Sequence, residues 1–220
     1  MLLAEELLLL AYDDERGNDT SWGSLDSGLA GAVLLDLSLA EAVTVEDGKI
    51  VATGDAEEPL LHDAVEAIRA SSRRRDAKAW IGRLPGALKP IAKRTARGLV
   101  EAGVLREERA KVLGLFPRTR FPAADPTVEE ELRARLTGVL VDGADPDPRT
   151  ALLVSLLVPL DLVKAVVPKD RRRDATRRAK EIADQGIVGS GLQRVVAETQ
   201  AAVMTAVLAA TTTSVAASSN

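Results

Sequence analysis

Residues 25–39 read LDSGLAGAVLLDLSL, an apolar stretch that contains several small side chains. A helix that is apolar on most of its sides is buried, because it has no broad polar face to present to water. The small residues Ser27, Gly28, Ala30 and Gly31 let neighbouring elements approach closely. The sequence therefore predicts a buried helix here, and Gly28-Leu-Ala-Gly31 lies inside it rather than in a phosphate-binding loop.

Helical patterns recur on both sides of this stretch, separated by Gly or by Asp/Pro-rich turns. Helices are expected over residues 2–11, 25–39, 59–71, 76–83, 89–102, 126–140, 148–166, 169–185 and 189–209. β-Branched residues around Asp47-Gly48 predict a tight hairpin over Val43–Val51, and a second hairpin is expected from about residue 104 to 116. We predict a mainly α protein: a single globular helical domain over residues 1–210 with two small β-hairpins, then a flexible tail over residues 211–220.

The composition argues against catalysis and against a metal site. The 220 residues include no cysteine and one histidine, His62, for which we expect a structural or surface role. Aspartates at 142, 145 and 147 lack the spacing of a calcium-binding loop. No Walker-type loop is present, and the acidic pairs are adjacent in sequence, so they need not converge on a site. We expect no enzyme activity, no metal and no cofactor.

Two apolar stretches, residues 150–168 and 192–210, were candidates for membrane spans. Each contains charged residues near its middle, which are costly inside a bilayer. The chain opens with Met-Leu-Leu-Ala-Glu-Glu, which is acidic where a signal peptide is basic. These features predict a soluble cytoplasmic protein in which both stretches are core helices.

Charge is distributed very unevenly along the chain. Residues 1–68 hold two basic and sixteen acidic side chains, whereas residues 69–120 hold fifteen basic and four acidic ones. A cationic segment of this strength is an electrostatic footprint for phosphate, carried either by lipid headgroups or by nucleic acid. A solvated helix face that binds nothing is the alternative.

The cationic segment has helical periodicity over residues 89–102. Spacing of 3.6 residues places Ile91, Thr95, Leu99 and Ala102 on a buried stripe. The same spacing turns a set of cations toward solvent: Lys89, Lys93, Arg94 and Arg97. This arrangement predicts a basic face that can meet phosphate oxygens.

Aromatic residues near this segment suggest a membrane interface. Trp80 follows the run Arg73-Arg74-Arg75, and an amphipathic indole beside cations suits the headgroup region. Phe116 and Phe121 lie in or just past the second predicted hairpin. They either insert into lipid or pack an interface between subunits, or they belong to the ordinary core.

Three long stretches of the sequence read LLAEELLLLAYDDERG (residues 2–17), SWGSLDSGLAGAVLLDLSLA (21–40) and LVEAGVLREERAKVLGLFPRTRFP (99–122). Together they resemble the Golgi phosphoprotein 3 family in its bacterial branch, the GPP34-type domain. Further matches run through ATRRAKEIAD, so the resemblance covers nearly the whole chain. It implies a single, mainly helical domain that binds membranes peripherally through phosphatidylinositol 4-phosphate. In eukaryotes the family also connects Golgi glycosyltransferase tails to coat proteins.

The resemblance also implies a lipid-binding site. The family's pocket tryptophan matches Trp22, and one of its basic residues matches Lys89. Two other basic positions of the family hold Ala30 and Ala92 here, and Lys93 and Arg94 lie close enough to substitute for them. The predicted headgroup site is therefore Trp22, Lys89, Lys93 and Arg94.

The second hairpin carries another expectation from the resemblance. In the family it contributes hydrophobic contacts for membrane insertion and self-association, and the matching residues here are Leu113, Leu115 and Phe116. The expected partners are thus an anionic phospholipid membrane surface and a second copy of the chain, joined through the hairpin over residues 104–116.

Two other interpretations stay open. A basic helix followed by a Gly103 turn and a charged hairpin resembles the recognition helix and wing of a winged-helix DNA-binding protein. Base-reading Asn and Gln are missing from that helix, so nucleic acid is not the expected partner. The second is a protein-interaction scaffold without lipid specificity, whose client protein the sequence does not identify.

Overall fold

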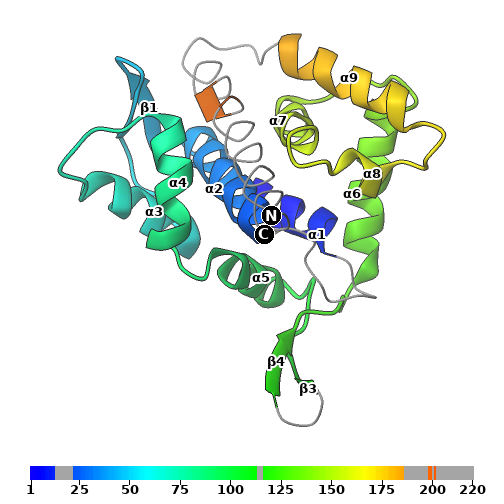
Figure 1. Ribbon diagram of the computed structural model, residues 1–220, viewed down its shortest axis with the longest axis horizontal. Coiled ribbons are helices and arrows are strands. Elements are labelled where there is room, and N and C mark those ends of the chain that lie inside the picture. The colour runs from blue at the N-terminus through cyan, green and yellow to red at the C-terminus, as the bar shows by residue number, and fades with distance from the viewer. Residues whose placement is uncertain (13–21, 113–115, 186–197, 200, 202–220) are drawn as a thin grey trace, which may run out of the picture.

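The computed structural model describes residues 1–12, 22–112, 116–185, 198–199 and 201, with the backbone alone at residues 22–24, 109–118 and 185. The fold is mainly α, as predicted from the sequence (Figure 1). The helices are α1 (Leu3–Ala11), α2 (Trp22–Leu39), α3 (Pro59–Arg69), α4 (Ala77–Ala87), α5 (Ile91–Glu101), α6 (Pro126–Leu140), α7 (Pro148–Leu157), α8 (Val163–Val166) and α9 (Arg172–Gln185).

Helix α2 lies at the centre of the packing, as its apolar sequence predicts. It contacts α1, α3, α4, α5 and α7, and its residues Leu29, Val33 and Leu37 are completely buried. Gly28 lies against Leu160, whose Cδ1 would be only 2.6 Å from a Cβ built at residue 28. The small side chains of α2 therefore serve close packing.

The first hairpin confirms the turn predicted at Asp47-Gly48. Strands β1 (Val43–Glu46) and β2 (Lys49–Ala52) pair antiparallel, with Glu46 opposite Lys49. Asp47 and Gly48 have φ of 49° and 70°. Two consecutive left-handed residues match the right-handed twist of the strands, which explains the Asp-Gly pair.

The second hairpin begins and ends later than predicted. Strands β3 (Glu108–Val112) and β4 (Phe116–Arg120) pair antiparallel, and the hairpin projects from the helical body (Figure 1). Val104 belongs to the core instead, with 8% of its surface exposed. The sequence suggested that the chain leaves the hairpin at Pro117, but Pro117 pairs with Lys111. A two-stranded ribbon has only edge strands, which tolerate a proline.

Two helices differ from their predicted bounds because of a proline. A single helix was expected over residues 148–166, but α7 ends at Leu157, just before Pro159, and the separate short helix α8 begins at Val163. Proline lacks an N–H group and its ring clashes with the preceding turn, so the helix stops there. Likewise Pro90 is the N-cap of α5, which leaves Lys89 outside the helix.

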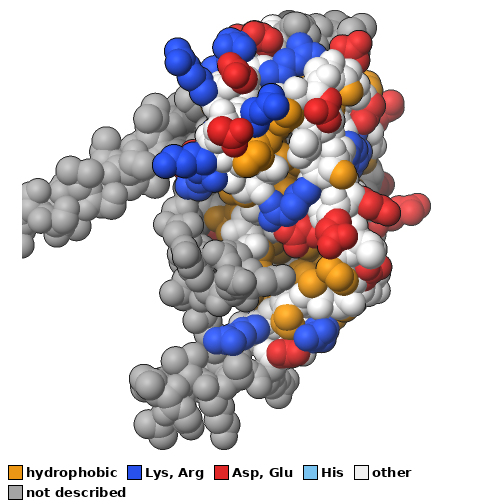
Figure 2. All heavy atoms as spheres, turned by 90° about the vertical axis from the view of Figure 1, so that its right-hand side faces the viewer, with side chains coloured by type: hydrophobic (Ala, Val, Ile, Leu, Met, Phe, Trp, Pro, Cys, Tyr) orange, Lys and Arg blue, Asp and Glu red, His pale blue; other side chains and the backbone are white. Residues whose placement is uncertain are grey.

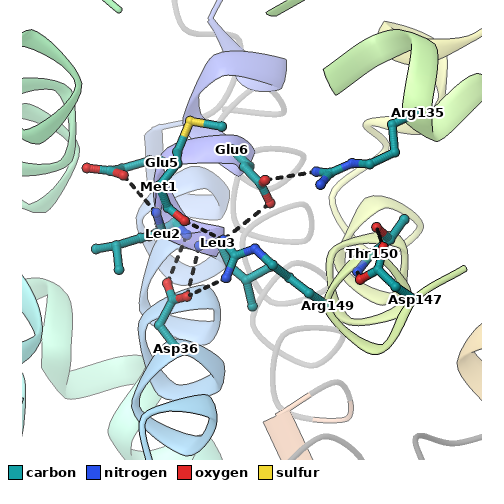
Figure 3. A network of polar contacts seen from close by, with 11 residues as sticks. Met1, Leu2, Leu3, Glu5, Glu6, Asp36, Arg135, Asp147, Arg149 and Thr150 are labelled. Atoms are coloured by element: carbon teal, nitrogen blue, oxygen red, sulfur yellow. Dashed lines mark hydrogen bonds and ion pairs between the residues drawn. The ribbon is translucent and has the colours of Figure 1, made fainter. Parts of the chain in front are cut away.

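Figure 3 shows a polar network at the N-terminal end of α1. The carboxylate of Asp36, on α2, accepts hydrogen bonds from the backbone N–H groups of Leu3 (2.9 Å) and Ala4 (3.1 Å). Asp36 is buried, and burial raises its pKa to about 7, against the opposing effect of these hydrogen bonds and of the Arg149 charge. Asp36 thus satisfies two backbone donors that a helix leaves unpaired at its start.

The buried carboxylate of Glu6 extends this network to two other helices. Arg135 of α6 lies 2.8 Å from Glu6, and Arg149 of α7 lies 3.5 Å from it (Figure 3). Because a buried carboxylate needs charged or hydrogen-bonding partners, these arginines hold α6 and α7 against α1. None of the helices in the described ranges combines the length and the apolar character needed to cross a membrane.

Candidate functional site

Helix α5 and the turn before it carry the α5 basic cluster, which we define as Lys89, Lys93, Arg94 and Arg97. The buried side of α5 is the predicted one: Ile91, Thr95 and Leu99 are at most 1% exposed. Ala102 is an exception, because it is the C-cap residue and is exposed. The cations occupy the remaining sides of the helix, as helical periodicity requires.

Two of these cations share one carboxylate. The Lys93 Nζ and the Arg97 Nε each lie 3.7 Å from an oxygen of Glu107, which precedes β3. Lys93 Nζ also lies 3.5 Å from the Thr119 hydroxyl oxygen on β4. These contacts join α5 to the base of the projecting hairpin, which leaves the helical body beside α5 (Figure 1).

Arg94 points to a different neighbour. Its guanidinium lies 2.7 Å from the Asp63 carboxylate on α3, and it donates to the backbone carbonyl of Pro59 at 3.5 Å. Lys89 is exposed in the turn before α5, and no described residue forms an ion pair with it. The structure thus brings three predicted site residues to one end of α5, with Lys89 unpaired and Lys93 and Arg94 each paired.

The paired cations remain available to a stronger anion. Their side chains are 26–54% exposed, and ion pairs of that exposure stabilise a protein by only about 0.2–1 kcal/mol. A phosphate group carries more negative charge and offers three acceptor oxygens. The geometry therefore suits exchange of a carboxylate partner for a phosphate.

The remaining predicted positions are less closely assembled by the described residues. Trp22 is the first residue of α2, but its side chain lies outside the described part of the structure. Ala30 is completely buried within α2, and Ala92 is half-buried on α5. Leu113 and Leu115 lie outside the described residues, and Phe116 is placed only by its backbone pairing with Val112.

Two aromatic residues belong to the core. Trp80 is 1% exposed, so the interpretation of its indole as a membrane-interface group is wrong. The guanidinium of Arg75 stacks over this ring, 5.6 Å from its centroid, and holds one of the run of arginines against the core. Phe121 is 6% exposed, and its backbone N–H donates to the Tyr12 hydroxyl at 3.3 Å.

The sequence did not reveal the carboxylates of the site. Asp63 and Glu107 lie 31 and 10 positions from their cationic partners Arg94 and Arg97. Glu107 follows Arg106 in a charged run, which is a weak signal of an ion pair with another element. Within the described ranges, no three His, Cys, Asp or Glu side chains gather in a way that could hold a metal ion.

Comparison with known proteins covers nearly all of the described chain. A model of the family described as Golgi phosphoprotein 3 (GPP34) matches residues 3–199. The chain is also 27% identical, over 164 residues, to "Vacuolar protein sorting-associated protein 74" of Schizosaccharomyces pombe. That alignment covers 64% of this chain and 48% of the relative, so the chain spans about half the length of the curated relative it matches.

Proposed function

This chain belongs to the Golgi phosphoprotein 3 family, and from that premise we propose that it binds anionic membranes peripherally through the α5 basic cluster. The observation that carries the proposal is that Lys93 and Arg97, two cations of the α5 basic cluster, lie against the base of a hairpin that projects from the helical body (Figure 1). A projecting element beside solvent-accessible cations can reach a flat membrane surface without a clash from the rest of the fold.

The charge of this region supports the proposal. Residues 89–120, which span α5 and the hairpin, hold nine basic and three acidic side chains. Each basic side chain near an anionic leaflet contributes about 1 kcal/mol of attraction, which decays within a Debye length. Two or three cations that face the bilayer at once would contribute about 2–3 kcal/mol, which adds to the binding of a headgroup.

The finer proposal concerns the headgroup. We propose a phosphoinositide such as phosphatidylinositol 4-phosphate, held by Lys89, Lys93 and Arg94 with the indole of Trp22. The basis is the resemblance of Trp22 and Lys89 to the family's pocket, together with the position of Lys93 and Arg94 on the first turn of α5. On this proposal the protein acts by binding rather than by catalysis.

Co-sedimentation with vesicles tests both levels of the proposal. Neutral vesicles are compared with vesicles that carry phosphatidylserine, phosphatidylinositol or phosphatidylinositol 4-phosphate at equal total charge. Preference for the phosphoinositide, weakened by Trp22→Ala in a folded protein, would support the specific pocket. Equal binding to all anionic vesicles would support electrostatic attachment alone. Binding to none of them would favour the alternative of a protein-interaction scaffold without lipid specificity.

Charge-removing variants locate the binding surface. Lys89→Gln combined with Arg94→Gln should weaken vesicle binding by roughly 30-fold, since two cations of about 1 kcal/mol each are lost. The control is Arg133→Gln with Lys164→Gln, which removes the same charge from α6 and α8. Equal losses in the two double variants would place the membrane contact elsewhere.

A further inference from the structure

Helix α9 carries a second basic surface, at the end of the molecule opposite the hairpin (Figure 1). Residues 169–180 hold seven basic and two acidic side chains. Ala175, Ala179 and Ile182 are buried and attach one side of α9 to the body. The other side faces solvent, and Figure 2 shows Lys and Arg side chains gathered at the upper end of this face of the molecule, with acidic side chains beside them.

A shallow hollow lies on the solvent side of α9. Its volume is about 470 Å³, and the described residues that line it are Arg172, Arg173, Thr176, Arg177 and Lys180. Their spacing places them on one face of the helix over slightly more than two turns. No carboxylate of the described residues lines this α9 hollow, so its lining offers only donors of hydrogen bonds and positive charge, apart from the threonine hydroxyl.

Among the described residues, fewer cations of the α9 hollow form ion pairs than in the α5 basic cluster. Arg177 has carboxylate partners, Asp174 at 2.9 Å and Glu181 at 3.8 Å. Arg172 instead donates to the backbone carbonyls of Lys164 and Val167, which fix its position without cancelling its charge.

Arg173 and Lys180 are both exposed, and neither has an ion pair with any residue in the described ranges. Together with Arg172 they leave three positive charges uncompensated in one hollow. Arg172 is also the first residue of α9, where the helix dipole adds positive potential.

Acidic side chains beside the hollow limit the size of its ligand. Asp170, Asp174 and Glu181 are exposed on the flank of the same segment. A long polyanion such as duplex DNA, lying across α9, would pass close to these carboxylates and be repelled by them. A compact anion that enters the hollow meets the cations first.

We propose that the α9 hollow is a second binding site, separate from the α5 basic cluster, for a compact phosphate ester. Arg172, Arg173 and Lys180 contact the phosphate oxygens, since guanidinium and ammonium groups form strong charge-assisted hydrogen bonds with them. The phosphate belongs either to a soluble molecule or to the headgroup of a lipid. Because the two basic surfaces lie at opposite ends, a lipid bound at α9 would belong to a different membrane from one bound at α5.

Calorimetric titration of the full chain with pyrophosphate tests the proposal. Arg173→Gln with Lys180→Gln should weaken pyrophosphate binding by at least roughly tenfold, since two charged hydrogen-bond donors are removed. The matched control is Arg171→Gln with Arg178→Gln, which takes the same charge from this segment without touching the lining residues and should have little effect. Equal weakening by both pairs, or no pyrophosphate binding by the wild type, would overturn the site.

Further arms separate this site from the α5 basic cluster and identify the source of the phosphate. The Lys89→Gln/Arg94→Gln variant should keep its pyrophosphate affinity, and loss of affinity only in that variant would move the phosphate site to α5. Clustering of anionic vesicles, measured by turbidity and abolished by the α9 double variant, would assign the phosphate to a lipid. Pyrophosphate binding without clustering would assign it to a soluble ester, and tighter binding of duplex DNA than of pyrophosphate through the same residues would overturn the proposal.

Discussion

Glu107→Gln should strengthen membrane binding, although it removes a contact of the folded protein. In the structure Glu107 is the shared partner of Lys93 and Arg97, each at 3.7 Å. A phosphate that approaches either cation must compete with this carboxylate. Replacing the carboxylate by an amide of the same shape frees both cations and also removes one negative charge from the surface that we propose faces the membrane.

The size of the effect follows from the exposure of the three side chains. Glu107, Lys93 and Arg97 are 30%, 35% and 54% exposed, so each pair contributes about 0.2–1 kcal/mol. Losing two such competing interactions should raise the affinity for anionic vesicles by about 2- to 30-fold. The free energy of unfolding should fall by a similar small amount, about 0.4–2 kcal/mol, because the same two pairs are lost.

Vesicle co-sedimentation at low ionic strength measures the gain, and urea denaturation measures the loss of stability. Glu101→Gln is the matched control, since Glu101 is an exposed carboxylate on α5 with no ion pair among the described residues. It changes the net charge equally but frees no cation. A gain with Glu107→Gln no larger than that with Glu101→Gln would refute the competition between carboxylate and phosphate.

Three further predictions concern the fold. Asp36 should make stability fall as pH rises: its pKa is raised to about 7 in the folded protein, so the folded state holds the proton more tightly than the unfolded chain. Between about pH 4 and pH 7 the wild type should lose about 4 kcal/mol relative to Asp36→Asn, and a constant difference between the two unfolding curves would contradict this. Trp80→Ala should lower the free energy of unfolding by about 3–5 kcal/mol in urea denaturation, because the indole is fully buried. A decrease below about 1 kcal/mol would contradict the burial of this side chain. Asp76→Ala should cost about 0.5–2 kcal/mol, since the Asp76 side chain accepts from the Ala79 N–H at the start of α4; an unchanged denaturation midpoint would exclude this cap.

Local signals predicted the fold well. The apolar run of α2 and the Asp47-Gly48 turn each act within a few residues, so the pattern alone was enough to identify a buried helix and a hairpin. The helix break at Pro159 was also visible in the sequence, but the apolar residues around it suggested one continuous helix. Pro117 can pair with Lys111 because both strands of this hairpin are edge strands. The number of strands in a sheet cannot be predicted from the local sequence around a proline.

The candidate site was predicted only in part. Periodicity identified the side of α5 on which Lys93, Arg94 and Arg97 lie, because that side is determined by the helix itself. Their partners Asp63 and Glu107 come from other elements, and no sequence pattern links them to α5. The burial of Trp80 is likewise a tertiary property, since a tryptophan after three arginines suits a surface and a core equally.

The polar network around α1 also has a consequence for the order in which the protein folds during synthesis. Glu6 pairs with Arg135, which lies 129 positions later in the chain, and with Arg149 beyond it. Closing so long a loop costs chain entropy, and this cost is offset only once the contact between the two ends has formed. The ribosome makes α1 before α6 and α7, so the buried carboxylate of Glu6 lacks these two arginine partners until both helices have emerged. Helix α1 can therefore pack on α2 early, but its buried carboxylate is paired only late in synthesis.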